Sequence, residues 1–367
     1  MGPLSGGRAP TIRATLRRLA LSGFADLVAS PAAAAEVSVA FGTPAMVVDL
    51  DRPAGADIGP PGLWDPARPP HLPGPAGLPV VVVGTHPDGL AGVPAGVAGL
   101  VDLVVADPEP VLATIEASPQ AAVTLALVLR ASLSLGVAEG LAAESAAYSM
   151  LQAGPEFARG RAGRAPGGPV GAGSPGIGPE AASPPASPAV LVDRDGPELR
   201  VTLNRPRRHN AVNTALRDDL VEALLVAGTD PSVERVALAG TGPSFCSGGD
   251  LDEFGSLPDP ATAHLVRLTR SPARLLAALG PRLEARLHGA CIGAGIEMAA
   301  FAGRVVARPD TRISLPELRL GLIPGAGGTV SLPRRIGRHR TAELALTATP
   351  IDAGTALAWG LVDAIEP

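Results

Sequence analysis

Residues 289–299 read Gly-Ala-Cys-Ile-Gly-Ala-Gly-Ile-Glu-Met-Ala, and residues 314–329 read Ser-Leu-Pro-Glu-Leu-Arg-Leu-Gly-Leu-Ile-Pro-Gly-Ala-Gly-Gly-Thr. Each stretch sets one glutamate, Glu297 or Glu317, in a glycine-rich frame. Two carboxylates can share one water and divide the acid and base roles. Glycine turns at helix starts can aim backbone N–H groups at a developing negative charge. With a third turn at residues 245–251, Phe-Cys-Ser-Gly-Gly-Asp-Leu, these stretches predict a site for chemistry at a carbonyl group.

The composition is that of a globular protein whose core consists of small aliphatic residues. The chain has 367 residues, 46% hydrophobic but only 2% aromatic, and all 30 basic residues are arginine. This length suffices for two domains, each with its own core. The net charge of −5 gives no support to nucleic-acid binding, so we expect no nucleic-acid partner. The two cysteines, Cys246 and Cys291, suggest small buried side chains; we expect no disulfide framework and no metal site.

Targeting and membrane signals are weak. Arginines at positions 8, 13, 17 and 18 precede an apolar stretch at residues 19–30, a pattern similar to that of a targeting peptide. Asp26 interrupts that stretch, and its spacing fits an amphipathic helix better. The most apolar run, residues 121–129, is too short to span a membrane. We therefore expect a cytoplasmic protein without a membrane partner.

The chain divides at a segment rich in Gly, Pro, Ala and Ser. Residues 159–188 cannot bury enough apolar surface to offset the entropy of ordering, which predicts a flexible, disordered linker. The spacing Gly171-x-Gly173-x-x-Gly176 inside it lacks a preceding strand and a following helix, so it is not read as a dinucleotide site. The predicted units are an N-terminal α/β region of unknown role, residues 1–158, and a C-terminal domain, residues 189–367.

Hydrophobic patterns predict α/β structure on both sides of the linker. Before it, we expect strands at 45–50, 79–83 and 101–106, and helices at 109–117 and 139–152. No constellation of acids, bases and nucleophiles stands out there. After it, we expect a hairpin at 189–203, strands at 236–239, 283–287, 304–307 and 312–315, and helices at 215–227, 261–279 (broken near Pro272), 293–302, 326–336, 339–347 and 352–359.

In this order the motifs resemble the crotonase superfamily, and its enoyl-CoA hydratase branch most closely, over roughly residues 189–366. The resemblance begins with residues 203–211, Leu-Asn-Arg-Pro-Arg-Arg-His-Asn-Ala, passes through the three glycine stretches, and ends at residues 358–363, Ala-Trp-Gly-Leu-Val-Asp. It implies the repeated ββα spiral fold of that family. It also implies an acyl-CoA thioester as substrate, a homo-oligomer that is a trimer in relatives, and no cofactor beyond the coenzyme A of the substrate.

The resemblance carries roles over to individual residues. It implies that the N–H groups of Gly249 and Ala294 form an oxyanion hole and that Glu297 and Glu317 flank the catalytic water. Tentative substrate-binding positions are Arg207, Arg208, Asn210, Ala211, Gly248, Asp250 and Gly293. Arginines at 334, 335, 338 and 340 are read as a solvated basic face rather than as phosphate ligands.

Simpler structural interpretations stand beside these roles. Each glycine alone makes a tight turn, Glu297 alone is an acid near a helix start, and Glu317 alone is an ion-pair partner for Arg319. Retention of both glutamates favours an enoyl-CoA hydratase over an isomerase that uses one of them. A catalytically silent acyl-CoA-binding or assembly protein stays open as a third function. Relatives continue past the strand at residues 361–365 with helices that cover the acyl pocket, so we expect either an open pocket or a cover supplied by the N-terminal half.

Overall fold

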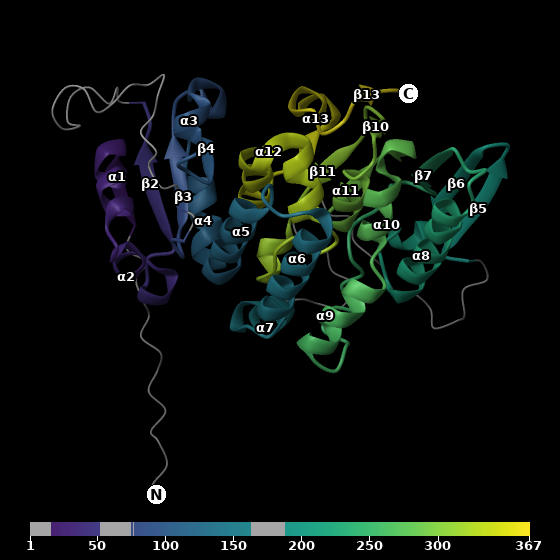
Figure 1. Ribbon diagram of the computed structural model, residues 1–367, viewed down its shortest axis with the longest axis horizontal. Coiled ribbons are helices and arrows are strands. Elements are labelled where there is room, and N and C mark those ends of the chain that lie inside the picture. The colour runs from purple at the N-terminus through teal and green to yellow at the C-terminus, as the bar shows by residue number, and fades with distance from the viewer. Residues whose placement is uncertain (1–15, 52–74, 76, 163–187) are drawn as a thin grey trace, which may run out of the picture.

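The computed structural model describes residues 16–51, 75, 77–162 and 188–367 (Figure 1). A small sheet with its helices lies at one end, a larger α/β part lies at the other, and the helices of residues 109–162 stand between them (Figure 1). The predicted mixed α/β class is confirmed.

The N-terminal sheet is parallel throughout. Its order is β1 (Arg17–Ala20), β2 (Ala45–Asp49), β3 (Val81–Thr85) and β4 (Leu103–Val105). β2 and β3 are Val-rich and almost wholly buried, as expected of strands covered on both faces. The predicted strands at 45–50, 79–83 and 101–106 are confirmed.

Short helical elements surround this sheet. They are α1 (Leu21–Ala29), α2 (Ala33–Glu36), η1 (Val39–Phe41), η2 (Gly89–Gly92) and α3 (Ala95–Ala98). The predicted amphipathic helix is right only from Leu21 onward, because Arg17 and Arg18 belong to β1. The remainder of that prediction, residues 1–15, lies outside the described residues.

Four consecutive helices follow: α4 (Glu109–Ala117), α5 (Pro119–Ala131), α6 (Val137–Gln152) and α7 (Pro155–Ala162). The helices predicted at 109–117 and 139–152 are confirmed. The apolar run at 121–129 lies in α5, which begins at Pro119, a residue that suits the first turn of a helix. The linker prediction starts too early, because residues 159–162 form the end of α7 and Phe157 anchors that helix in the core. Residues 163–187 of that prediction lie outside the described residues.

A six-stranded sheet forms the frame of the C-terminal part. Its order is β13 (Ala364–Ile365), β10 (Arg304–Ala307), β8 (Leu283–Leu287), β7 (Arg235–Gly240), β6 (Glu198–Leu203) and β5 (Val190–Asp195). β5 and β6 form the predicted antiparallel hairpin, whose turn places Gly196 at φ 57°, and all other pairs are parallel. The helices linking these strands are α8 (Thr214–Thr229), α9 (Pro260–Thr269) and α10 (Pro272–Leu279), with short turns η3 (Pro206–Arg208) and η4 (Gly280–Arg282).

A three-stranded sheet positions the two glutamates of the sequence motifs. Its order is β12 (Ile351–Asp352), β11 (Arg312–Ser314) and β9 (Ala290–Ile292). β9 leads into α11 (Ala294–Ala299), and β11 leads into η5 (Glu317–Leu320). Because β9 and β11 are parallel, with Ile292 opposite Ser314, their carboxyl ends deliver both segments to the same edge.

The chain closes with α12 (Gly328–Thr347) and α13 (Ala353–Trp359). Gly337, at φ 79°, breaks the helical geometry inside α12, as the separate predictions for 326–336 and 339–347 require. The arginines of this region are not a solvated basic face. They donate hydrogen bonds to backbone carbonyl groups: Arg334 to Leu135, Arg335 to Ala302 and Leu361, Arg338 to Gly99 and Val101, and Arg340 to Trp359.

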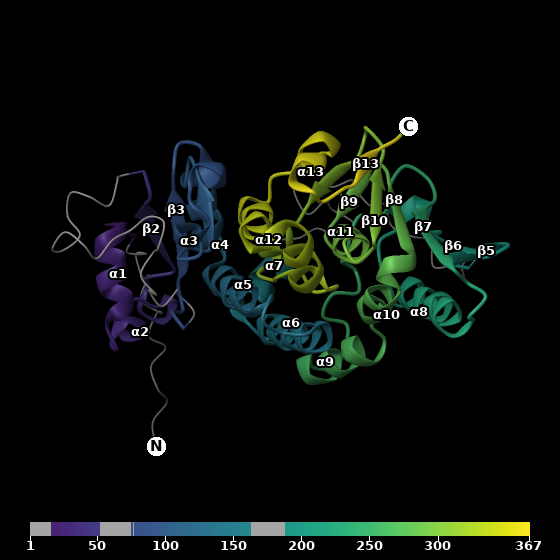
Figure 2. The same cartoon turned by 45° about the horizontal axis from the view of Figure 1, so that its top comes forward.

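The main hydrophobic core crosses the predicted domain boundary. Leu125 and Tyr148 of the helical segment share one buried cluster with Leu287 and Leu332 of the C-terminal part. A second cluster lies within the N-terminal sheet and its helices, although Val47 and Val83 of that sheet belong to the main cluster. Figure 2 shows α5 and α6 beside α12 and α9, and these helix pairs are in contact. The helical segment is therefore packed as part of the C-terminal body, unlike the predicted division with separate cores.

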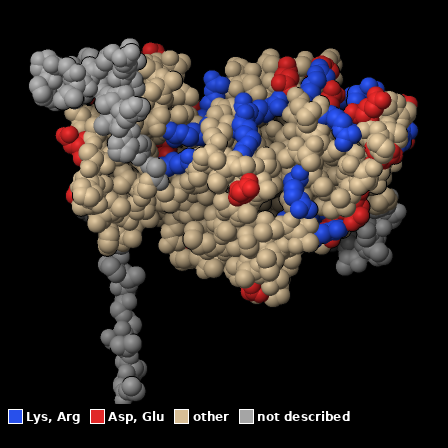
Figure 3. Space-filling model, in the orientation of Figure 1, with Lys and Arg blue, Asp and Glu red and all other residues tan. Residues whose placement is uncertain are grey.

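The surface is unevenly charged. In the view of Figure 3, red and blue side chains mix over the sheet of the C-terminal part, whereas the area over α6 and α9 is mostly uncharged. Exposed apolar side chains on these two helices include Met150 and Leu265. Within the described ranges, no single helix is long and apolar enough to cross a membrane, although two bent helix pairs satisfy the length and composition.

Candidate active site

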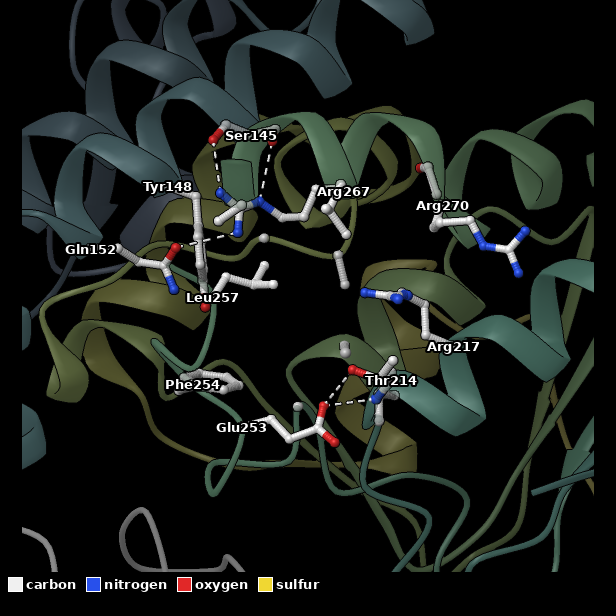
Figure 4. Close-up of a pocket in the computed structure, with 18 of the residues that line it drawn as sticks. Ser145, Tyr148, Gln152, Thr214, Arg217, Glu253, Phe254, Leu257, Arg267 and Arg270 are labelled. Atoms are coloured by element: carbon white, nitrogen blue, oxygen red, sulfur yellow. Dashed lines mark hydrogen bonds between the residues drawn. The ribbon is translucent and has the colours of Figure 1, made fainter. Parts of the chain in front are cut away.

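A cavity of ≈ 640 Å³ lies between the helical segment and the C-terminal part. Four residues with predicted catalytic roles line it together: Gly249, Ala294, Glu297 and Glu317. Its walls also include side chains of α6, α8 and α9, which Figure 4 shows projecting from opposite sides. The three glycine stretches of the sequence therefore meet at one place.

The first glycine turn lies directly against the start of α11. The backbones of Cys246 and Cys291 form an isolated parallel β-bridge. Within it, Ile292 N–H donates to the Cys246 carbonyl group at 2.9 Å. Gly248 has φ 100°, and a Cβ there would lie 3.1 Å from the Ile292 carbonyl oxygen and 4.0 Å from the Ala294 nitrogen. The positive φ and this close approach together require glycine at position 248.

Two backbone N–H groups have no described acceptor where these turns meet. In the described part of the chain, the N–H groups of Gly249 and Ala294 donate to no protein acceptor. Ala294 is the first residue of α11, where the helix itself supplies no partner for the N–H group. Both residues border the cavity, so their N–H groups are available to a ligand.

Glu297 is buried within α11, and two backbone bonds fix its carboxylate. Its Oε2 accepts hydrogen bonds from the N–H groups of Ala326 at 2.7 Å and Gly328 at 2.9 Å. The side chain is packed tightly there, because a Cβ at Gly328 would lie 2.6 Å from the Glu297 Cγ. Only 2% of the residue is exposed, so its carboxylate faces the cavity rather than bulk water.

Glu317 is held differently. Its Oε2 is buried and has no hydrogen-bond partner among the described residues. Its Oε1 lies so close to the start of α11 that a Cβ on Gly293 would be 2.4 Å from it. Arg319, the ion-pair partner weighed from the sequence, instead donates to the Ala348 carbonyl oxygen. The unpartnered oxygen leaves Glu317 available to a ligand.

Burial controls the protonation of both acids. Desolvation raises the pKa of Glu317 to about 8. Desolvation also raises the pKa of Glu297 well above its ordinary value, and repulsion from Glu317 adds to this effect. The two backbone hydrogen bonds to Glu297 oppose the shift because they stabilise its charged form. The cavity therefore favours retention of a proton on this pair at neutral pH.

Three of the tentative substrate-binding residues are committed to the protein itself. Asn210 is fully buried; its Oδ1 accepts from Arg205 N–H and its Nδ2 donates to the carbonyl groups of Thr241, Ser244 and Phe245. The buried Asp250 lines the cavity but pairs with Arg205 at 3.1 Å and Arg208 at 3.0 Å. These contacts hold the first glycine turn, and the substrate-binding roles of Asn210, Asp250 and Arg208 stay predictions.

The remaining tentative positions divide between backbone and surface. Ala211 is fully buried, and its carbonyl group accepts a hydrogen bond from Arg205. Gly248 and Gly293 permit the close approach of the two turns. Arg207 is exposed and outside the cavity lining, so its substrate-binding role stays a prediction.

The C-terminal part of the chain is similar in sequence to known proteins. The enoyl-CoA hydratase/isomerase family profile matches residues 199–367. A 2,3-dehydroadipyl-CoA hydratase of Escherichia coli is 38% identical over 178 residues, which make up 48% of this chain and 69% of the relative. The chain belongs to the enoyl-CoA hydratase/isomerase family. The predicted resemblance is thereby confirmed.

Other family members match over the same part. An enoyl-CoA isomerase/hydratase of Mycosarcoma maydis is 32% identical over 46% of this chain and 64% of the relative. The solved enoyl-CoA hydratase of Thermoplasma volcanium is 32% identical, with a TM-score of 0.45, over 49% of this chain and 72% of that one. The chain spans about two thirds of the length of these family members.

The contribution of α6 to the cavity was not predicted from the sequence. Leu141, Glu144, Ser145, Tyr148 and Gln152 all line the cavity. Their spacing of three or four residues marks one face of a helix. Two polar residues, Glu144 and Ser145, are buried on that face, and acids are rarely buried without a specific partner. A glutamate within an otherwise packed helical face was the signal available in the sequence.

Proposed function

We propose that the protein adds water across the double bond of a trans-2-enoyl-CoA thioester. The observation that carries this proposal is the convergence of two unpaired amides and two carboxylates in one cavity. Membership of the family supports a coenzyme A thioester as the substrate class.

The thioester oxygen would lie between the N–H groups of Gly249 and Ala294. Attack of water at C3 moves electron density through C2 onto that oxygen, and two fixed donors stabilise the resulting enolate. The loss of one such donor typically costs about 3 kcal/mol of transition-state stabilisation. Because both donors are backbone groups on packed turns, they need no reorganisation during the reaction.

The two glutamates would divide the proton transfers. Glu297, whose carboxylate form is stabilised by two N–H groups, takes a proton from water as the oxygen bonds to C3. Glu317, whose pKa burial raises to about 8, gives its proton to C2. The product is a 3-hydroxyacyl-CoA, and return of the proton from Glu297 to Glu317 restores the enzyme. The reaction moves only water and protons, so it calls for no resident metal or redox cofactor.

Glutamine substitutions at both positions test this division. We expect Glu297→Gln and Glu317→Gln each to lower kcat for crotonyl-CoA hydration by at least ~100-fold while thioester binding persists. An isomerase that uses one glutamate predicts instead that one variant keeps turnover of a 3-enoyl-CoA. Hydration at near wild-type rate in either variant would refute the assignment.

A further inference from the structure

Helix α6 carries another buried carboxylate of the cavity, Glu144, which binds the same backbone stretch as Glu297. The four successive N–H groups of residues 326–329 alternate between the two carboxylates. Those of Ala326 (2.7 Å) and Gly328 (2.9 Å) donate to Glu297, and those of Gly327 (2.7 Å) and Thr329 (2.8 Å) donate to Glu144. The Thr329 hydroxyl group adds a third bond to Glu144 at 2.7 Å.

This arrangement links the orientation of Glu297 to Glu144. The stretch 326–329 leads into α12, where the first N–H groups lack partners within the helix. Gly327 has φ 103° and turns the chain so that alternate N–H groups point to opposite sides. Loss of the acceptor on one side leaves two buried N–H groups unsatisfied, which favours a shift of the whole turn. The two amides that fix Glu297 would move with it.

Glu144 is itself held by contacts between α6 and α9. Ser149 Oγ donates to the Pro260 carbonyl oxygen at 2.8 Å. The Arg267 guanidinium lies 4.7 Å from the centre of the Tyr148 ring and donates to Ser145 and Gln152, as Figure 4 shows. Glu144 thus projects from a helix, α6, that these contacts with α9 hold in place.

We propose that Glu144 is a positioning residue for Glu297 and that residues 109–162 therefore belong to the active site. By holding Gly327 and Thr329, Glu144 fixes the neighbouring amides that aim the Glu297 carboxylate. This inference rests on the proposed hydratase function. A displacement of about 1 Å at a catalytic group can cost about 100-fold in rate. Loss of the hydrogen bonds from Gly327 and Thr329 to Glu144 can therefore lower turnover through a small shift of Glu297.

The charge of Glu144 gives an additional readout. Desolvation raises its pKa to about 7, and its negative charge contributes to the raised pKa values of Glu297 and Glu317. The titratable and charged groups around Glu297 are Glu317 of η5, Glu144 and Tyr148 of α6, Cys246, and Arg267 of α9, which faces Glu144. Removal of the Glu144 charge should therefore lower the pKa of both catalytic acids.

The test compares Glu144→Gln with Glu139→Gln in the full chain. Glu139 lies in the same helix but is exposed, so its substitution controls for charge and for helix stability. We expect Glu144→Gln to lower kcat about 10- to 100-fold with KM within about 2-fold. The pH dependence of its remaining activity should move toward lower pH, whereas Glu139→Gln should match the wild type in both respects. Unchanged kcat in folded Glu144→Gln would overturn the proposal.

A milder variant covers the case in which Glu144→Gln does not fold. Thr329→Val removes the hydroxyl donor to Glu144 but keeps the Thr329 N–H bond, and we expect kcat to fall about 3- to 10-fold at constant KM. A folded Thr329→Val protein with wild-type kcat would contradict the link.

Amide hydrogen exchange separates this inference from the proposed function. If the wild type hydrates no enoyl-CoA, the function is wrong, but the link between the carboxylates can still be measured. We expect residues 326–329 to lose protection in Thr329→Val and Glu144→Gln and to keep it in Glu139→Gln. Equal protection in all three variants would overturn the inference.

Discussion

Replacement of Ala294 by proline isolates the contribution of one amide. Ala294 is the first residue of α11, a position where proline is tolerated because its missing N–H would have no helical partner. Ala294→Pro therefore removes the N–H that we assign to the thioester oxygen while α11 keeps its geometry. The loss of one such donor corresponds to about 3 kcal/mol, or 100- to 1,000-fold in kcat.

The assay is steady-state hydration of crotonyl-CoA, with thermal unfolding as the check on folding. Ala294→Gly keeps the N–H, so we expect only a small change in kcat. Ala95→Pro places proline at the same position of α3, where Ala95 is exposed and no residue lines the cavity, and should retain full activity. A folded Ala294→Pro enzyme with more than about one tenth of wild-type kcat would refute the oxyanion role of this amide.

Four further outcomes follow from the contacts described above. Burial raises the pKa of Glu317 from 4.5 to about 8, so the wild type loses stability as pH rises through that range. Glu317→Gln should therefore raise Tm at pH 8 by about 2–4 °C relative to the wild type. Equal Tm values for variant and wild type across that pH range would contradict this. Gly293→Ala should lower kcat at least about 10-fold by displacing Glu317, whereas Gly228→Ala, a helical site with open space, should leave kcat unchanged and Tm no lower. Asn210→Ala should cost about 2–3 kcal/mol in the free energy of unfolding measured with urea, since three carbonyl groups and one N–H lose their partner; a cost below about 0.5 kcal/mol would count against it. A fragment of residues 188–367, which lacks the helices of residues 109–162, should bind hydrophobic dye and lose thioester binding, and a soluble, active fragment would count against the shared core.

Features that depend on neighbouring residues were predictable from the sequence. The hairpin around Gly196 follows from a turn signal between alternating strands, and the break before Pro272 follows from the chemistry of proline. Glu297 and Glu317 stand out because the turns that frame them are local. The two glutamates meet in one cavity because β9 and β11 are parallel neighbours. The family resemblance predicted that both would flank the catalytic water.

Features that depend on distant contacts were not predictable. Arg208 and Asn210 belong to a motif shared with the family, but Asp250, which accepts from Arg208, and Thr241, which accepts from Asn210, lie more than 30 residues away in the chain. Arginines of α12 bind carbonyl groups of the N-terminal half, which no local pattern indicates. Glu144 is separated from Gly327 by 183 residues, and only the packing of α6 over the cavity shows its role.

The most direct test of the proposed hydration is the fate of a water oxygen. Purified full-length protein would be incubated with crotonyl-CoA in water enriched in a heavy oxygen isotope, and the thioester product would be analysed by mass spectrometry. We predict a 3-hydroxybutyryl-CoA that carries one heavy oxygen, at a rate reduced at least ~100-fold by Glu297→Gln and by Glu317→Gln. Unaltered crotonyl-CoA under conditions in which the thioester is bound, or a shifted double bond without oxygen incorporation, would contradict hydration.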